Sequence, residues 1–164
     1  MYLQWLIAHD FDAGADAAAL AAAQLADGQA RAAGGKGRVV LCHVVNPVPL
    51  VITPDLMGLP DMNANLAANI EQATRLLQGK ANALQARFPS LQVEARLCQG
   101  PTVPTLLEEA EHQHVDAIAV GSHGRKGVAW ALMGSVSERA VHKSRKPVLV
   151  VKVDEPSSGI AATA

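Results

Sequence analysis

Short apolar runs alternate along this chain with longer segments in which apolar residues recur every three or four positions. The apolar runs predict strands at Tyr2 to Ala8, Arg38 to Val45, Leu91 to Leu97, Val115 to Gly121 and Pro147 to Val153. The periodic segments predict helices at Ala13 to Ala33, Leu66 to about Phe88, Thr102 to Glu111 and Ser135 to about Ser144. Strands that alternate with helices form parallel sheets covered on both faces, so the pattern predicts an α/β fold.

Glycine, proline and polar residues separate these elements. Gly34 and Gly35 follow the first helix and are expected to end it. A loop is predicted where four prolines gather, at Pro47, Pro49, Pro54 and Pro60. The run from Ser135 to Glu138 matches a capping box, which places the start of the last helix at Ser135. We therefore expect one domain over residues 1–153, followed by a flexible tail of small and polar residues over 154–164.

The predicted elements fit an open, doubly wound, Rossmann-like sheet of five parallel strands with helices on both faces. In the expected strand order 3-2-1-4-5, the order reverses between the first and fourth strands. Ligands bind such sheets at the carboxyl ends of the strands beside the reversal. Those two strands end at Asp10 and Gly121, so an acidic residue and a glycine-rich segment should face one crevice.

Composition narrows the classes of partner. The 164 residues are 49% hydrophobic and 18% charged, with 14 Lys and Arg against 15 Asp and Glu, so we expect no nucleic-acid partner. No run approaches the roughly 18 apolar residues that a membrane span needs, and the N-terminus lacks signal-peptide features. We therefore expect a cytoplasmic protein with no membrane partner. Cys42 and Cys98 lie in apolar runs without metal-ligand spacing, which indicates buried thiols in a reducing compartment.

The most informative segment runs from Gly121 to Ser135 and has the spacing G-x2-G-x9-G-S. It follows the apolar run Ala117 to Val120 and precedes a helix. Glycine lets the backbone turn sharply and approach an anion, and the unpaired N–H groups of a helix's first turn point at it. The segment therefore predicts a phosphate site. Within it, Arg125 and Lys126 either neutralise phosphates or are solvated, and the apolar spacer with Trp130 forms a packed lid or a short helical turn.

This spacing resembles the nucleotide-binding motif of the universal stress protein family. The resemblance covers roughly Tyr2 to Lys152, and its most specific parts are Val-Gly-Ser-His-Gly-Arg, Met-Gly-Ser-Val-Ser-Glu-Arg and Lys-Pro-Val-Leu-Val-Val between Val120 and Lys152. It implies an adenine-nucleotide-binding protein that acts in stress response or regulation, in which ATP or AMP biases conformation or oligomeric state. Mg²⁺ would accompany ATP, and whether a protein side chain holds the metal is left open.

The resemblance also implies the residues of the site. The phosphates and ribose would contact Gly121, His123, Gly124, Gly134, Ser135, Val136 and Ser137. The adenosine end would contact Ala8, His9, Asp10, Val44 and Val120. An alternative role for Asp10 is to cap the helix that follows it.

Two residues depart from the family pattern. Pro104 adds a second proline to the turn after the third strand, and Asp12 places a negative charge near an anion site where many family members have a small hydroxyl residue. Elsewhere, His112 and His114 form an H-x-H arrangement, which indicates either a metal site or, more simply, solvated imidazoles at a helix end.

No enzyme motif accompanies the glycine-rich segment. The chain has no Gly-x-Ser-x-Gly elbow and no Walker-type Gly-Lys-[Ser/Thr], so we predict a protein that is not an enzyme, with at most slow, incidental ATP hydrolysis. One rival is a dimeric interaction module of the same fold that binds no nucleotide. Another is an ATP-dependent synthetase or pyrophosphatase domain, but the Ser-Gly-Gly-x-Asp-Ser loop of such enzymes is missing after the first strand.

The last strand favours a homodimer. Lys146 to Val153 is a continuous β-branched, apolar run that the expected strand order places at an edge of the sheet. Pairing with a second copy would satisfy its open backbone groups, and the family resemblance implies the same dimer. The alternatives are an edge protected by its flanking lysines or by the tail folding back.

Overall fold

The computed structural model describes residues 3–46, 62–122 and 134–153. Its strands are β1 (Gln4–Ala8), β2 (Gly37–Val45), β3 (Leu91–Gln99), β4 (Ala117–Gly121) and β5 (Val148–Val151). Its helices are α1 (Ala13–Ala32), α2 (Met62–Arg87), α3 (Thr102–His112) and α4 (Ser135–Lys143). The predicted proline-rich loop, the spacer of the glycine-rich segment and the C-terminal tail lie outside the described residues.

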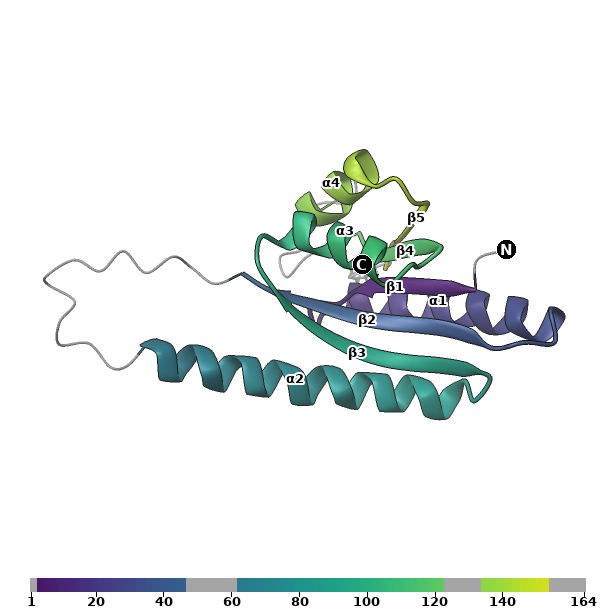
Figure 1. The fold of residues 1–164 in the computed structure, drawn as a ribbon, viewed down its shortest axis with the longest axis horizontal. Helices are drawn as coiled ribbons and strands as arrows, with labels where there is room; N and C mark the ends of the chain where they lie inside the picture. Colours follow the sequence, from purple (N-terminus) through teal and green to yellow (C-terminus); the bar gives the residue numbers. More distant parts are fainter. Residues whose placement is uncertain (1–2, 47–61, 123–133, 154–164) are drawn as a thin grey trace, which may run out of the picture.

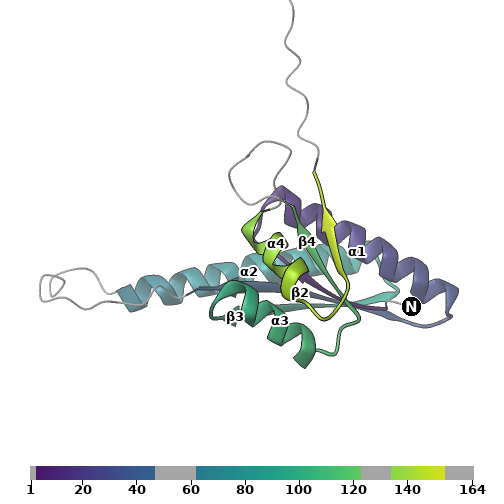
Figure 2. The same ribbon diagram turned by 90° about the horizontal axis from the view of Figure 1, so that it is seen from above.

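All five strands form one parallel sheet in the order β3-β2-β1-β4-β5, which confirms the predicted fold class and strand order. Each predicted helix and strand is present, and the boundaries differ by a few residues. The largest difference is in α2, which begins at Met62 where periodicity predicted Leu66. Figure 1 shows α2 running alongside β3, and Figures 1 and 2 show α3 and α4 together over the opposite face of the sheet.

The side chains of alternate strand residues pack into two apolar layers, one on each face of the sheet. On β2, Val39 and Leu41 face the layer under α1 and α2, whereas Val40 and Cys42 face the layer under α3. This period of two is the reason that nearly every residue in the middle of β2 is buried, because both faces of a doubly covered sheet exclude water. The sheet is therefore held rigidly, and the carboxyl ends of its strands form a fixed frame.

Alanine brings α1 close to the sheet. Seven alanines of this helix are buried, and their small side chains let its backbone lie directly on β1 and β4; they are Ala15, Ala18, Ala19, Ala22, Ala23, Ala26 and Ala30. The helix ends where predicted, because Gly34 adopts a φ of +65° that other residues rarely take. There the Gly35 N–H donates to the Ala30 carbonyl at 2.9 Å and closes the last turn.

The predicted capping box at the start of α4 is wrong. The N-cap residue is Gly134, and none of the described side chains caps it. The Gly134 N–H donates to the Ser122 carbonyl at 2.7 Å, which holds Gly134 extended against the end of β4 and makes Ser135 the first helical residue. The Ser137 hydroxyl instead donates to the Gly134 carbonyl at 2.8 Å. The start of the helix is therefore set by a backbone contact with Ser122, which lies outside the four-residue motif.

Within residues 3–46, 62–122 and 134–153, no helix has both the length and the apolar character that a membrane span requires.

Candidate functional site

A cleft of about 250 Å³ opens at the carboxyl ends of the central strands, at the point where the strand order reverses. It is bordered by the ends of β1, β2 and β4 and by the first turns of α1, α3 and α4. Its lining residues are Ala8, His9, Asp10, Asp12, Ala15, Cys42, His43, Val44, Thr102, Leu106, Val120, Gly121 and Val136. The floor is mostly apolar and the rim carries the carboxylates of Asp10 and Asp12, so the cleft offers apolar packing surface beside charged groups.

Gly121 makes this corner of the cleft possible. An added Cβ at this position would lie 2.7 Å from the carbonyl carbon of Gly14, 2.9 Å from its oxygen and 3.1 Å from the Ala15 nitrogen. These are backbone atoms of the first turn of α1, so they have little freedom to move aside. Glycine at position 121 is thus required for α1 to lie against the end of β4.

His9 is a structural member of the cleft wall. Its side chain is buried, its Nδ1 accepts from the Phe11 N–H at 3.1 Å, and its Nε2 lies 3.2 Å from Asp16 Oδ1. Since Nδ1 accepts, the proton belongs on Nε2 and is donated to Asp16. Burial lowers the pKa of His9, against the opposing effect of Asp16, so the ring is neutral at pH 7. The Asp16 carboxylate also accepts from Lys80 Nζ at 2.7 Å, and this ion pair connects α2 to the start of α1.

The loop between β1 and α1 is held in an unusual conformation. Phe11 has a φ of +68°, a left-handed value that is uncommon for residues other than glycine. Its ring packs against the rings of His9 and His43, with centroid separations of 5.5 Å and 4.6 Å. His43 Nδ1 also lies 2.7 Å from the His9 carbonyl oxygen, to which it donates. These contacts fix the direction in which the following acidic residues leave the strand.

Asp10 and Asp12 place two carboxylates at the rim. Asp12 is the N-cap of α1, because its Oδ1 accepts from the Ala15 N–H at 2.7 Å. Asp10 therefore does not take the capping role that we considered for it; its Oδ1 accepts from the Asp12 N–H at 3.2 Å. Partial burial raises the pKa of Asp10, and the neighbouring Asp12 adds to the shift. Negative charge is thus concentrated where α1 begins.

The first turn of α4 has a different character. Val136 lies in the cleft lining, and the described residues provide no side-chain cap for this helix. The α4 N–H groups therefore favour an external acceptor, whereas the start of α1 is already bound to its own carboxylate. The amino end of α4 is the more suitable position for an anion.

The structure brings together seven of the twelve predicted site residues in the cleft lining. They are Ala8, His9, Asp10, Val44, Val120, Gly121 and Val136. Gly134, Ser135 and Ser137 lie at the start of α4, where the Ser137 hydroxyl is buried and already bonded to a backbone carbonyl. His123 and Gly124 lie outside the described residues.

Sequence reasoning missed several lining residues. Cys42 precedes Val44 by two positions on one strand, so the strand period alone places both on the same face. Thr102 and Leu106 are four residues apart on α3, and their helical spacing directs both toward the sheet. Ala15 reaches the cleft because α1 approaches the end of β4 so closely, and the sequence gives no direct signal of that approach.

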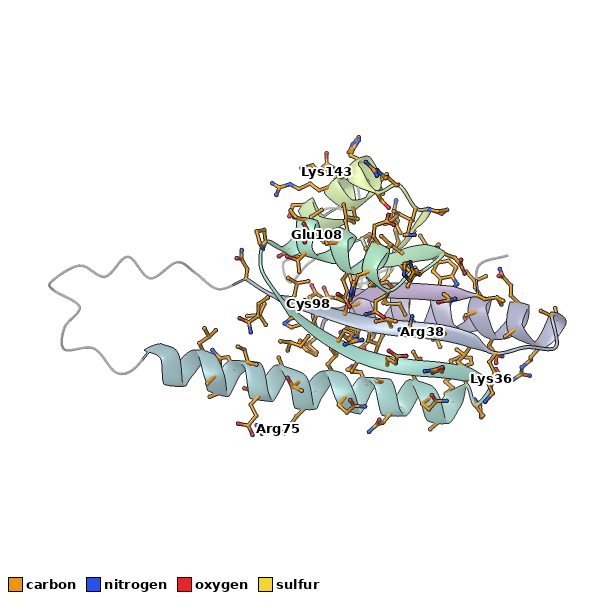
Figure 3. All side chains as sticks on the ribbon, viewed as in Figure 1. Lys36, Arg38, Arg75, Cys98, Glu108 and Lys143 are labelled. Carbon is orange, nitrogen blue, oxygen red and sulfur yellow. The ribbon has the colours of Figure 1, made fainter. Side chains whose placement is uncertain are left out.

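A second cleft, of about 180 Å³, lies between the C-terminal ends of α3 and α4. Glu108 on α3 and Lys143 on α4 line it and are labelled in Figure 3. Its charges are of both signs, and Lys146 Nζ is already paired with Glu111 at 3.3 Å. This cleft lies at the C-terminal ends of its helices, whereas the first cleft combines an apolar floor with the amino end of α4.

The histidines of the H-x-H arrangement and the two cysteines lie in different environments. His112 and His114 are exposed at the end of α3, and within the described part of the chain no three metal-binding side chains gather in one place. Cys42 is buried as predicted, whereas Cys98 is partly exposed; both are free thiols.

A family model and curated relatives of this chain point to the same protein family. The model of the universal stress protein family matches residues 1–152. A curated universal stress protein from Thermus aquaticus is 32% identical over 152 residues, which cover 93% of this chain and 100% of that protein. The chain spans about a third of the length of the first curated relatives that it matches, since two such alignments cover 36% and 29% of the relative.

Solved structures share the fold. UspA from Lactobacillus plantarum superposes with a TM-score of 0.75 at 20% identity, covering 92% of this chain and 97% of that one. A universal stress protein family protein from Arabidopsis thaliana with AMP bound gives a TM-score of 0.56 at 18% identity, covering 94% and 96% of the two chains. At these identities the likeness establishes the fold.

Proposed function

This chain belongs to the universal stress protein family, and on that premise we propose that it binds an adenine nucleotide, ATP or AMP, in the cleft at the carboxyl ends of β1 and β4. The proposed role is binding, in which the nucleotide biases conformation or oligomeric state, and not catalytic turnover. The observation that carries the proposal is an apolar floor in one cleft with the amino end of α4, for which the described residues provide no side-chain cap. The AMP-bound Arabidopsis relative supports the same ligand class.

Each part of a nucleotide has a suitable partner in this cleft. The apolar floor, made by Ala8, Val44, Val120 and Leu106, can pack against a purine ring. The first-turn N–H groups of α4 can donate to phosphate oxygens, and the absence of a side chain at Gly134 gives those oxygens access to the backbone. The base would therefore lie over the strands and the phosphates beside α4.

Asp10 and Asp12 suggest a role for a cation. Two carboxylates at the rim repel a bare triphosphate, and Mg²⁺ prefers to bridge carboxylate and phosphate oxygens. We propose that ATP enters with Mg²⁺, which would contact one or both carboxylates. A nucleotide monophosphate carries less charge and has less need of the metal.

Nucleotide binding should stabilise the folded protein. A ligand that binds only the native state at 100 times its dissociation constant adds about 2.7 kcal/mol to the free energy of unfolding. We expect MgATP to raise the melting temperature of nucleotide-free protein by this mechanism, measured by circular dichroism. A melting curve unmoved by millimolar ATP and AMP would contradict the proposal and favour the interaction module.

Asp12 offers a test of the charge in the cleft. Asp12→Ser keeps a side-chain cap for α1 but removes a negative charge from the rim. We expect the affinity for AMP without divalent cations to rise about fivefold, because a repulsion of about 1 kcal/mol is relieved for unit charges 4 Å apart in water. The measurement is isothermal titration calorimetry.

Asp12→Ala is the matched variant. It removes the same charge together with the cap, so it should show the same gain in affinity and lose about 1 kcal/mol of stability. Unchanged AMP affinity in both variants would place the phosphate away from Asp12.

We propose further that β5 pairs with its own copy in a homodimer. The Ile118 and Ser122 N–H groups donate to the carbonyls of Pro147 and Val151 at 2.9 and 2.8 Å. The backbone groups of successive residues point to opposite sides of a strand. Since the Pro147 and Val151 carbonyls face β4, the N–H and C=O groups of Val148 and Val150 face the open edge of the sheet. Among the described residues no strand covers this edge, and pairing about a two-fold axis would satisfy it.

The alternation identifies Val150 as the position to change. Val150→Pro removes an edge-facing donor and should convert the dimer to a monomer while the circular dichroism spectrum stays native. Val150→Ala loses comparable packing but keeps the N–H, so it should remain dimeric. Multi-angle light scattering distinguishes the two; a monomeric wild type or a dimeric proline variant would rule out this interface.

A further inference from the structure

Cys42 and Cys98 form a close pair of free thiols. They are the only two cysteines of the chain, and the Cys42 thiol points to Cys98 Sγ across a sulfur–sulfur distance of 3.9 Å. They lie on the neighbouring strands β2 and β3, where Cys42 is opposite Arg96 and Cys98 is opposite Val44. Both side chains join the apolar layer under α3, and Cys98 is labelled in Figure 3.

The two thiols differ in their access to solvent. Cys42 is only 1% exposed, whereas Cys98 is partly exposed near the end of β3, which is an edge strand. In such an arrangement the accessible thiol can react with an oxidant to give a sulfenic acid, and the shielded thiol can then react with that acid to form a disulfide. Cys42 also lines the cleft. Neither sulfur has a role in the proposed binding of nucleotide.

We propose that Cys42 and Cys98 are a redox pair that a hydroperoxide converts to one intrachain disulfide beside the cleft. In the first step Cys98 Sγ, having lost its proton, attacks the O–O bond of the peroxide. The O–O bond breaks, the sulfur gains OH as a sulfenic acid, and the other oxygen leaves and takes up the proton that Cys98 released, giving an alcohol or water. In the second step Cys42 Sγ attacks that sulfur, the S–O bond breaks, and hydroxide leaves with the Cys42 proton as water. Two electrons pass from the sulfurs to the peroxide.

The geometry indicates what must move. A disulfide bond is about 2.05 Å long, so the two sulfurs must approach by about 1.9 Å from their separation of 3.9 Å. Cys42 is enclosed in the central part of the sheet, whereas β3 lies at the edge and continues into Gly100, whose φ is +144°. We therefore expect the end of β3 to move, together with Thr102, which begins α3 and lines the cleft.

The environment of the pair sets the pH dependence of the reaction. Burial raises the pKa of both thiols, and the carboxylate of Glu109 raises it further, whereas Arg96 acts against this rise at Cys98. Since the thiolate is the nucleophile, disulfide formation should be slow at pH 7 and accelerate about tenfold for each pH unit above it.

The test uses the intact protein, hydrogen peroxide and mass spectrometry. After exposure, the protein is denatured in N-ethylmaleimide and its intact mass is measured with and without a reductant. We expect wild-type protein to lose two hydrogens and bind no maleimide, and to bind two maleimides after reduction. Cys42→Ser and Cys98→Ser should never lose two hydrogens. Two thiols that stay reactive, thiols that only gain oxygen, or a disulfide-linked dimer would each overturn the proposal.

A consequence for the cleft rests on the proposed function. We expect the disulfide form to bind AMP at least tenfold more weakly than the reduced form, because the end of β3 and Thr102 are displaced. Reduced protein that fails to bind AMP would contradict the proposed function, while the masses would still decide the disulfide. Equal AMP affinity in the two forms would show that the bond leaves the cleft unchanged and would overturn this consequence alone.

Discussion

Replacing Gly121 with alanine is expected to lower the free energy of unfolding by about 3 kcal/mol, the upper part of the range for overpacked sites. The new Cβ would lie 2.7 Å from the Gly14 carbonyl carbon and 2.9 Å from its oxygen, closer than such atoms normally approach. Because these are backbone atoms of the first turn of α1, relief requires the helix to move from β4. That movement would also open the corner of the cleft and weaken nucleotide binding.

Gly28 supplies the matched control for this prediction. It lies on the exposed side of α1, and an added Cβ there meets nothing within 4 Å. Gly28→Ala should therefore raise stability by up to about 1 kcal/mol, the difference in helix propensity. Urea unfolding measures both variants. A Gly121→Ala protein as stable as the wild type would show that α1 does not depend on close contact with β4.

Replacing Gly134 with valine is expected to reduce the affinity for ATP and AMP at least 100-fold, about 2.7 kcal/mol, without unfolding the protein. Gly134 has φ −61° and ψ 153°, values that valine adopts readily. Its N–H can still donate to the Ser122 carbonyl. The branched side chain would instead occupy the space at the amino end of α4 that we assign to phosphate.

Gly134→Ala distinguishes the effect of side-chain size from the effect of losing the conformational freedom of glycine. Alanine fits the same φ and ψ but is smaller, so we expect a loss of affinity intermediate between wild type and the valine variant. Calorimetric titration with AMP measures the affinities, and far-ultraviolet circular dichroism checks the fold. If Gly134→Val bound nucleotide as tightly as the wild type, the segment would be a turn without a phosphate role.

The order of the elements was accessible from the sequence because their signals are local and repeated. The apolar run of β2 and the three- and four-residue spacing in α2 each predict one element without knowledge of the rest. Alternation of strands and helices then predicts a parallel sheet, and the glycine-rich segment marks its ligand-binding edge. The confirmed strand order brings the ends of β1 and β4 together at one cleft, as predicted.

What the sequence did not predict depends on contacts between distant segments. Helix α4 begins at Ser135 as predicted, but the sequence did not predict the hydrogen bond from the Gly134 N–H to the Ser122 carbonyl just before it. His9 lines the cleft, and nothing in the sequence indicates that both of its ring nitrogens are engaged by Phe11 and Asp16. The close approach of Cys42 and Cys98 depends on the register of β2 and β3, which is fixed only when the sheet assembles.

If an adenine nucleotide binds at the carboxyl ends of β1 and β4, adding AMP to nucleotide-free protein should change the amide chemical shifts of the residues there, which NMR can map. We expect saturable shifts centred on Ala8, Asp10, Val44, Gly121 and Val136, with the second cleft around Lys143 unaffected. Shifts centred on Lys143 and Lys146, or no saturable shifts at millimolar AMP, would contradict the binding of nucleotide in the first cleft.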